Sequence, residues 1–282
     1  MVKVAAVQMQ MGMDKSDNIA RAIAYVKEAA RSGAQIILLP ELFEGLYFCK
    51  DKDEGYFEWA GALEGHPLIE QFSLLAKTLE VVLPVSYFEK DGDDFYNALV
   101  VIDADGRVLE NYRKTHIPDG PGYEEKFYFK PGNTGFKVWK TKYADIGVGI
   151  CWDQWFPETA RALTLQGAEL IFYPTAIGSE PEIEVDSQAH WQRVQQGHAA
   201  ANTVPVIAAN RIGQEQGKSC TLTFYGASFM SDHTGAIVSE ASREHEEIIY
   251  GEYDLKMIAA HRKYWALLTD RRPEMYGKLC ES

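Results

Sequence analysis

The fold is indicated first by residues 2–41, which read VKVAAVQMQMGMDKSDNIARAIAYVKEAARSGAQIILLPE. Residues 2–9 are rich in valine and alanine, and residues 36–39 form a second compact apolar run, so both predict buried strands. Between them, Ser16 or Asp17 can cap a helix whose apolar residues recur on one face. A strand, a helix and a second strand in this order predict a layered α/β protein.

The same alternation continues along the rest of the chain, without a repeat, a low-complexity tract or a linker. Periodicity and turn residues predict further strands at 81–88, 96–102, 107–114, 146–150, 170–173, 204–209, 223–230, 236–239 and 247–253. They predict further helices at 67–79, 157–166, 187–203 and 255–268, and a hairpin turn at 104–106. The 282 residues, 46% of them apolar, are enough for one substantial core, so we predict a single domain over residues 1–282.

A long loop is predicted at residues 115–134, where prolines and glycines recur. A loop of this length within a compact chain is usually either functional or disordered. The aromatic run FYF at 127–129 favours an ordered, functional loop.

The chain carries 41 acidic and 28 basic residues, which give a formal net charge of -13. We expect no nucleic-acid partner, because binding to phosphates needs a surplus of lysine and arginine. The same charge is compatible with a cationic small-molecule substrate, although an acidic surface often serves solubility alone.

Four scattered cysteines, at positions 49, 151, 220 and 280, have no zinc-ligand spacing, so no structural metal is expected. The N-terminal apolar stretch is interrupted by glutamines and charges, unlike a signal peptide, and no other segment is long enough to span a bilayer. We therefore predict a cytoplasmic protein with free thiols and no membrane partner.

Three polar residues follow predicted strands directly: Glu41 after IILLP, Lys114 after VLENYR and Cys151 after IGVGI. In layered α/β folds the strand ends form a natural site, because the rigid sheet holds side chains that loops leave exposed. Taken singly, each has an ordinary alternative as a turn glutamate, a surface lysine or a small core cysteine. Together they suit hydrolysis of an amide or a urea, which needs a strong nucleophile and relief of charge on the carbonyl oxygen.

In such a reaction Cys151 would attack as a thiolate and the ammonium of Lys114 would stabilise the oxyanion. Glu41 could take the thiol proton, pass it to departing ammonia and then activate water. We expect Gly147 and Gly149 to let another backbone approach the buried strand closely. Backbone amides in the turn toward the following helix could hold the thiol of Cys151 partly as thiolate.

The motifs around these residues resemble the nitrilase superfamily of carbon–nitrogen hydrolases: LLPELF around Glu41, YRKTHIP around Lys114 and GICWDQWFPE around Cys151. The order and spacing fit that superfamily, and the resemblance runs from VAAVQM to DRRPEMY, over nearly the whole chain. It implies a four-layer α-β-β-α sandwich, no cofactor, and subunits that pair across a sandwich face into a homodimer or a larger homo-oligomer. It also implies that the backbone N–H of Trp152 assists Lys114 at the oxyanion.

A second glutamate of these hydrolases is matched in GYEEKFYF (122–129), where the resemblance places it on Glu125 rather than Glu124. There it would orient Lys114 or the leaving nitrogen of the substrate. Within the superfamily, HIPDGPGYEEKFYFKPG, CWDQWFPE and FYPTAIGSEP resemble the N-carbamoylputrescine amidases of polyamine synthesis. This resemblance implies hydrolysis of N-carbamoylputrescine to putrescine, ammonia and carbon dioxide through a covalent thioester at Cys151.

The charge of the residues after the nucleophile favours the same cationic ureide as substrate. Relatives that hydrolyse N-carbamoyl amino acids place arginine shortly after the nucleophile, which suits a substrate carboxylate. Here those positions hold Asp153 and Gln154, which would repel an acidic substrate and favour an amine. We predict that Glu180 meets the distal ammonium of the substrate, with Asp119 and Asp153 behind it.

Several other functions stay open at this point. The chain could be an ω-amidase, a nitrilase or an N-carbamoyl amino acid hydrolase, or a catalytically silent scaffold that binds partners through a sandwich face. A redox-sensing thiol protein would need Cys49 or Cys220 as a resolving cysteine near Cys151. His116, two residues past Lys114, could be the base of a Cys–His dyad, which would require a different fold.

Overall fold

The structure is a computed structural model that describes residues 1–179 and 185–281 of the chain. Its α-helices are α1 (Lys15–Arg31), α2 (Pro67–Leu79), α3 (Glu125–Tyr128), α4 (Pro157–Leu165), α5 (Gln188–Asn202) and α6 (Leu255–Trp265). Its 3-10 helices are η1 (Phe48–Lys50), η2 (Glu54–Trp59), η3 (Cys151–Trp155), η4 (Pro273–Met275) and η5 (Gly277–Cys280). Its strands are β1 (Val2–Gln8), β2 (Ile36–Leu38), β3 (Leu83–Asp91), β4 (Asp94–Ile102), β5 (Val108–Arg113), β6 (Val138–Lys140), β7 (Asp145–Val148), β8 (Leu170–Pro174), β9 (Val206–Ala209), β10 (Ile212–Gln216), β11 (Thr221–Tyr225), β12 (Phe229–Ser231), β13 (Ile237–Glu240) and β14 (Glu247–Tyr253).

The first strand, helix and strand form as the sequence predicts, with β1 and β2 parallel. Helix α1 is capped by Asp14, whose Oδ1 accepts hydrogen bonds from the backbone amides of Ser16 and Asp17 at 2.8 and 3.2 Å. The predicted caps, Ser16 and Asp17, therefore lie within the first turn, and the acid that precedes the helix is the cap.

One sheet has the strand order β14-β1-β2 and continues into β3-β4-β5. The two parts join where the amide of Ile37 donates to the carbonyl of Val82 at 3.0 Å and the amide of Val82 donates to that of Gln35 at 2.9 Å. The predicted hairpin turn between β4 and β5 closes with a hydrogen bond of 2.8 Å from the Gly106 amide to the Asp103 carbonyl. This sheet is parallel in its middle and antiparallel toward both edges.

The second sheet has the order β13-β12-β9-β8-β7-β6, with β7, β8 and β9 parallel. The single strand predicted at 223–230 is wrong, because Gly226 and Ala227 adopt left-handed backbone conformations with φ of 59° and 54°. The chain turns there, so β11 pairs with β10 in a separate hairpin while β12 joins the sheet. Strands β6 and β10 are not predicted from the sequence.

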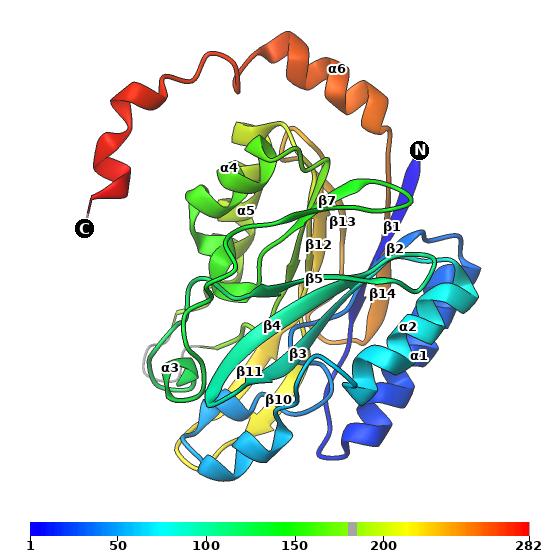
Figure 1. The fold of residues 1–282 in the computed structure, drawn as a ribbon, viewed down its shortest axis with the longest axis vertical. Helices are drawn as coiled ribbons and strands as arrows, with labels where there is room; N and C mark the ends of the chain where they lie inside the picture. The colour runs from blue at the N-terminus through cyan, green and yellow to red at the C-terminus, as the bar shows by residue number, and fades with distance from the viewer. Residues whose placement is uncertain (180–184, 282) are drawn as a thin grey trace.

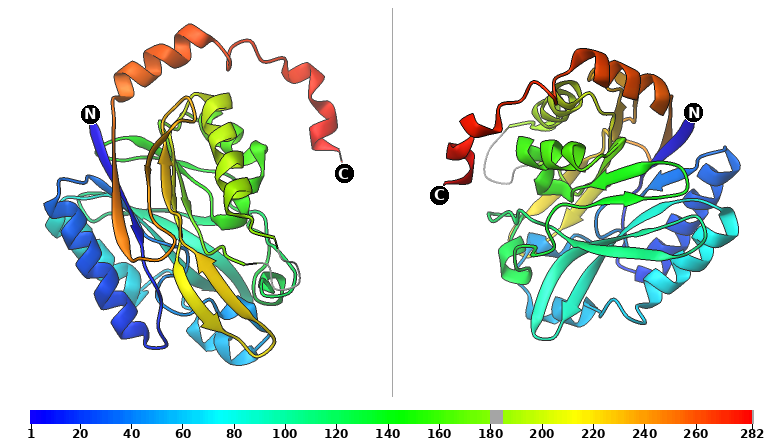
Figure 2. Two further views of the ribbon diagram at one scale, coloured as in Figure 1. Left: turned by 180° about the vertical axis from the view of Figure 1, so that it is seen from behind. Right: turned by 45° about the horizontal axis from the view of Figure 1, so that its top comes forward.

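The two sheets lie face to face between two layers of helices (Figure 1). Helices α1 and α2 cover the outer face of the first sheet, and α4 and α5 cover that of the second, which confirms the predicted α-β-β-α sandwich. Helix α6 and the segment after it form an arm (residues 255–281) that extends away from the sandwich (Figures 1 and 2). Within the part of the chain that the structure describes, no helix has the length and apolar character needed to cross a membrane.

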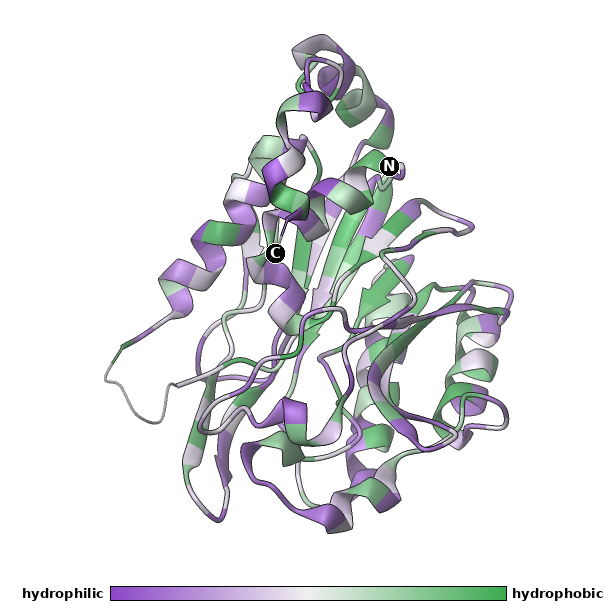
Figure 3. Cartoon of the chain, turned by 60° about the vertical axis from the view of Figure 1, so that its left-hand side comes forward, coloured by the Kyte–Doolittle hydropathy of each residue, from purple (hydrophilic) through white to green (hydrophobic). Residues whose placement is uncertain are grey.

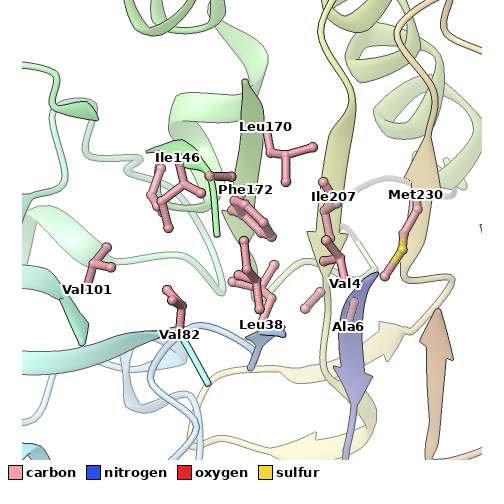
Figure 4. Close-up of a cluster of buried hydrophobic side chains, with 14 of the residues drawn as sticks. Val4, Ala6, Leu38, Val82, Val101, Ile146, Leu170, Phe172, Ile207 and Met230 are labelled. Carbon is pink, nitrogen blue, oxygen red and sulfur yellow. The ribbon is translucent and has the colours of Figure 1, made fainter. Parts of the chain in front are cut away.

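Side chains along β1 alternate between two cores. Val4 and Ala6 face the second sheet and pack with Phe172 in the core between the sheets (Figure 4). Ala5 and Val7 face the layer of α1 and α2. The central strands are accordingly largely apolar (Figure 3), and the close packing of buried side chains between the sheets holds the ends of these strands in place.

The glycines at positions 147 and 149 make room for side chains. A Cβ at Gly149 would lie 2.9 Å from Cε1 of Tyr173 and 3.1 Å from Cβ of Asp153, and one at Gly147 would lie 3.0 Å from Cβ of Leu163. The prediction that another backbone approaches here is therefore wrong. The missing side chains instead let α4 and the turn after β7 pack closely against the sheet.

The long loop at residues 115–134 contains α3 and is anchored at both ends. The amide of Gly132 donates to the carbonyl of Lys114 at 2.7 Å, which brings the two ends of the loop together. Its aromatic run packs against residues elsewhere, with the ring of Tyr128 centred 5.0 Å from that of Phe48. This packing holds the loop beside the strand ends.

Candidate active site

The ends of three strands bring the predicted catalytic residues together. Glu41 follows β2, Lys114 follows β5 and Cys151 follows β7, while Glu125 comes from α3 in the long loop. The ammonium of Lys114 lies 2.9 Å from Oε1 of Glu41 and 2.8 and 2.7 Å from the two carboxylate oxygens of Glu125. These three side chains are fully buried, so the charged cluster lies in the interior of the protein.

The charges in this cluster determine each other's protonation. Burial alone would lower the pKa of Lys114, but the carboxylates of Glu125 and Glu41 outweigh it and hold that pKa well above its usual value. The side chain therefore stays an ammonium. Burial raises the pKa of Glu125, and the charge of Glu41 adds to this against the opposing effect of Lys114.

Glu41 uses one carboxylate oxygen within the protein and leaves the other free. Its Oε1 accepts hydrogen bonds from Lys114 and, at 2.7 Å, from Nδ2 of Asn97. Its Oε2 is buried and has no hydrogen-bond partner among the described residues. A buried oxygen without a donor is energetically costly, and it is also the acceptor that a general base requires.

Cys151 begins η3 with a φ of 40°, a left-handed conformation that is rare for a residue with a side chain. Its Sγ lies 3.7 Å from the carbonyl of Ala176 and 3.9 Å from Nε2 of Gln154. Burial and the negative charge of Glu41 raise the pKa of the thiol well above its usual value, against the opposing charge of Lys114. Burial therefore disfavours the partial thiolate that the sequence predicts.

A cavity of about 130 Å³ opens beside Cys151 and is also lined by Glu125. Its other walls come from the long loop, from Trp152 and from residues 176–177 after β8. Two of the residues predicted to bind substrate line it: Trp152, and Asp119, which is exposed to solvent. The cavity thus connects the buried charged cluster with an acidic mouth.

Asp153 has a different place from the one predicted. Its carboxylate is fully buried and accepts hydrogen bonds from the hydroxyl of Tyr112 at 2.7 Å and the amide of Ile150 at 2.9 Å. The other oxygen lies 3.0 Å from the backbone nitrogen of His116 and 2.7 Å from its Nδ1. Both oxygens of Asp153 are engaged and Asp153 is not among the residues that line the cavity, so it ties the turn of Cys151 to the segment around Lys114 and does not contact substrate there.

The imidazole of His116 stacks on Phe156 with ring centroids 3.6 Å apart, and its Nδ1 is engaged by Asp153, so this geometry gives no support to a Cys–His dyad. Cys49, Cys151, Cys220 and Cys280 are all free cysteines in the structure. Glu180 lies outside the described residues, and its role stays a prediction.

Two residues of the site escape prediction from the sequence. Asn97 donates to Glu41, and the hydroxyl of Tyr47 donates to Oε1 of Glu125 at 2.7 Å. The only hint for Asn97 is an amide within the apolar strand FYNALVVI, whereas nothing in the surrounding residues distinguishes Tyr47. Both are fully buried and hold the carboxylates in place.

The described residues contain no group of three or more histidine, cysteine, aspartate or glutamate side chains that could hold a metal ion. An α-β-β-α sandwich that brings a cysteine, a lysine and two glutamates together at one site is the arrangement expected of a carbon–nitrogen hydrolase. The model of the carbon-nitrogen hydrolase family matches residues 3–263, and the chain belongs to this family.

Relatives and solved structures agree with this assignment. The chain is 54% identical over 284 residues to an N-carbamoylputrescine amidase of Oryza sativa subsp. japonica, covering 99% of this chain and 94% of that protein. It is 51% identical over 279 residues to a citrullinase of Francisella tularensis subsp. tularensis (strain SCHU S4 / Schu 4), covering 99% and 98%. A crystal structure of a carbon-nitrogen hydrolase from Helicobacter pylori G27 superposes with a TM-score of 0.93 at 36% identity, covering 99% of this chain and 98% of that chain.

Cys151 is expected to be a neutral thiol at neutral pH. Because its pKa is raised, the ultraviolet absorbance of its thiolate should appear only at alkaline pH. The measurement is a difference titration between the wild type and Cys151→Ser, in which the contributions of the other three cysteines cancel. A thiolate signal at neutral pH that disappears in the variant would contradict this expectation.

Proposed function

We propose that this protein hydrolyses N-carbamoylputrescine to putrescine, ammonia and carbon dioxide, with Cys151 as nucleophile. The observation that carries the proposal is the convergence of Cys151, Glu41, Lys114 and Glu125 beside one cavity with an acidic mouth. Sequence identity of 53–54% to N-carbamoylputrescine amidases over nearly the whole chain supports the same substrate.

The reaction starts from the neutral thiol. Oε2 of Glu41 accepts the thiol proton as the sulfur of Cys151 attacks the ureido carbon. Collapse of the tetrahedral intermediate expels ammonia, which receives that proton from Glu41 and leaves a carbamoyl thioester on the sulfur. Glu41 then takes a proton from water, water attacks the thioester, and the thiol is restored. The released carbamate loses carbon dioxide to give putrescine.

Lys114 is the proposed donor to the oxyanion of the tetrahedral intermediate. Its three N–H groups face three carboxylate oxygens, two of them on Glu125, so the oxyanion would replace one of the contacts to Glu125. The backbone N–H of Trp152, the residue after the nucleophile, is the proposed second donor to the oxyanion. Glu125 would then orient the ammonium that remains.

The cavity favours a substrate with a cationic end. No lysine, arginine or histidine is among the described residues that line it, whereas Asp119 lies at its mouth. N-Carbamoylputrescine and citrulline share the ureido group, but citrulline also carries a carboxylate that would need a basic partner. Citrulline is a second candidate because a relative that is 51% identical is a citrullinase. The charge of the cavity favours the diamine derivative.

We expect the wild type to release ammonia from N-carbamoylputrescine faster than from citrulline, and not from N-carbamoyl-β-alanine. Cys151→Ala should abolish release, since the thioester cannot form without the sulfur. The assay is coupled detection of ammonia with all three ureides at equal concentration. Faster release from citrulline would indicate that citrulline is the substrate. Release mainly from N-carbamoyl-β-alanine would exclude a cavity that selects for cations.

Asp119→Asn is expected to raise KM for N-carbamoylputrescine about tenfold, because loss of one ammonium–carboxylate contact costs on the order of 1–3 kcal/mol. KM for the neutral analogue N-butylurea should not change. Glu124→Gln is the matched control, since Glu124 pairs with Lys52 at 2.9 Å and does not line the cavity. An equal effect of Asp119→Asn on both substrates would contradict the proposed contact.

We also propose a cytoplasmic homodimer or larger homo-oligomer. Free cysteines suit a reducing compartment. The arm at residues 255–281 extends from the sandwich (Figure 2) and exposes large apolar side chains, with Tyr264 87% and Trp265 57% exposed. A second copy of the chain would cover these apolar side chains.

Replacing Tyr264 and Trp265 together by glutamate is expected to lower the molar mass in solution to that of a monomer. The reason is that charged side chains would have to be buried at the interface between copies. The measurement is light scattering coupled to gel filtration. Leu74→Glu, on the opposite layer and 68% exposed in the wild type, is the control that should keep the native mass. A wild type that is itself a monomer would contradict the proposal.

A further inference from the structure

Arg211 is a fully buried cation that the proposed chemistry does not use. It follows β9 in the second sheet, yet its guanidinium reaches the turn after β2 in the first sheet. Its Nη2 donates to the backbone carbonyls of Glu41 at 2.8 Å and Leu42 at 3.2 Å, and its Nη1 donates to that of Gly45 at 3.3 Å. One side chain thus holds three carbonyl oxygens of the turn that carries Glu41.

Apart from Arg211, a few hydrogen bonds hold this turn: the amide of Leu42 donates to Oγ of Ser86 at 3.1 Å, and the amide of Glu41 donates to the carbonyl of Thr175 at 3.4 Å. Leu42 has a φ of 47°, so the backbone leaves the strand abruptly and its carbonyls cannot pair within the sheet. The fork of donors on a guanidinium can satisfy several carbonyls at once, which a lysine ammonium on a flexible stem does less well. The geometry therefore needs an arginine at this place.

The guanidinium is itself held in place by a second buried cluster. Oε1 of Glu215 lies 2.8 Å from Nη1 of Arg211, and Oε2 of Glu215 accepts hydrogen bonds from the amide of Tyr47 at 2.7 Å and from Lys50 at 3.3 Å. The hydroxyl of Tyr47 in turn donates to Glu125. The two clusters are thus physically connected through Tyr47.

The two clusters also balance in charge. Three buried cations face three buried anions: Arg211, Lys50 and Lys114 against Glu215, Glu41 and Glu125. A buried charge is tolerated when an opposite charge is paired with it. The second cluster has two cations and one anion, so its charge offsets that of the catalytic cluster, which has one cation and two anions.

We propose that Arg211 is a positioning residue that fixes the carboxylate of Glu41 against the sulfur of Cys151. Glu41 stands on the first sheet and Cys151 on the second, and Arg211 bonds the turn of the first to the strand end of the second. The rate of proton transfer depends steeply on the distance between the carboxylate of Glu41 and the sulfur of Cys151. The inference rests on the proposed function, because it assigns Glu41 as the base of Cys151.

The test compares Arg211→Lys with Arg262→Lys, using ammonia release and the rate at which iodoacetamide alkylates Cys151. Arg262 is the matched control, since it also donates to two backbone carbonyls, of Thr203 at 3.0 Å and Ala168 at 3.3 Å, but lies on α6. Arg211→Lys is expected to lower kcat by about 10- to 100-fold with KM little changed. Alkylation should slow in parallel, while Arg262→Lys leaves both rates at the wild-type level.

A double-mutant cycle distinguishes positioning of Glu41 from a general loss of structure. In the Glu41→Gln background, Arg211→Lys should have little further effect on alkylation, because the base that it positions is already absent. An equal slowing in both backgrounds, or equal losses of kcat in Arg211→Lys and Arg262→Lys, would overturn the inference. If Arg211→Lys does not fold, Glu215→Gln replaces it in the same test. This substitution weakens the contact that holds the guanidinium of Arg211 while it keeps the shape of the side chain at position 215.

The activity of the Glu41→Gln variant tests the proposed function independently of the role of Arg211. A Glu41→Gln variant as active as the wild type would overturn the proposed function itself. A Glu41→Gln variant without activity, together with an unaffected Arg211→Lys variant, would overturn only the role of Arg211.

Discussion

The architecture of this protein depends on one buried cation, the ammonium of Lys114. It has no contact with solvent, so it is stable only where carboxylates surround it, and Glu41 and Glu125 provide them. Removing one partner of a buried ion pair costs about 3–5 kcal/mol, because it leaves a charge without compensation. Strands β2 and β5 must therefore end close to Glu125 of the long loop, so the fold requires the same convergence of residues as the chemistry.

Apolar packing secures that convergence. The core between the sheets, which includes Val4 and Phe172, sets where the strands end, and the aromatic run of the long loop anchors Glu125 from the other side. The charges consequently lie in fixed positions within a dry interior. Donors and acceptors that need no rearrangement during the reaction are the arrangement that stabilises developing charge most effectively.

The sequence predicts which residues meet, but not the direction in which each side chain points. Short apolar runs that end in a polar residue indicate that Glu41 and Cys151 lie at strand ends, and the fold class follows from the same runs. Asp153 lies only two residues past Cys151, but the tight turn of η3 directs its carboxylate into the interior toward Tyr112. The charge of a residue next to the nucleophile therefore indicates little about the charge of the substrate unless the conformation of the turn is known. The left-handed conformation of Ala227, which interrupts the predicted strand, is likewise a backbone property that the strand propensities of the residues do not predict.

The site stands on two sheets that are held together by apolar side chains, whose contacts have no preferred direction, and by a limited set of hydrogen bonds such as those of Arg211. Apolar side chains resist being pulled apart, but they oppose sliding along one another much less than hydrogen bonds would. A small shear of one sheet over the other would carry the carboxylate of Glu41 away from the sulfur of Cys151 while every hydrogen bond within each sheet persisted. Activity therefore depends on the relative position of the two sheets, so heating or pressure would lower the activity before the secondary structure changed.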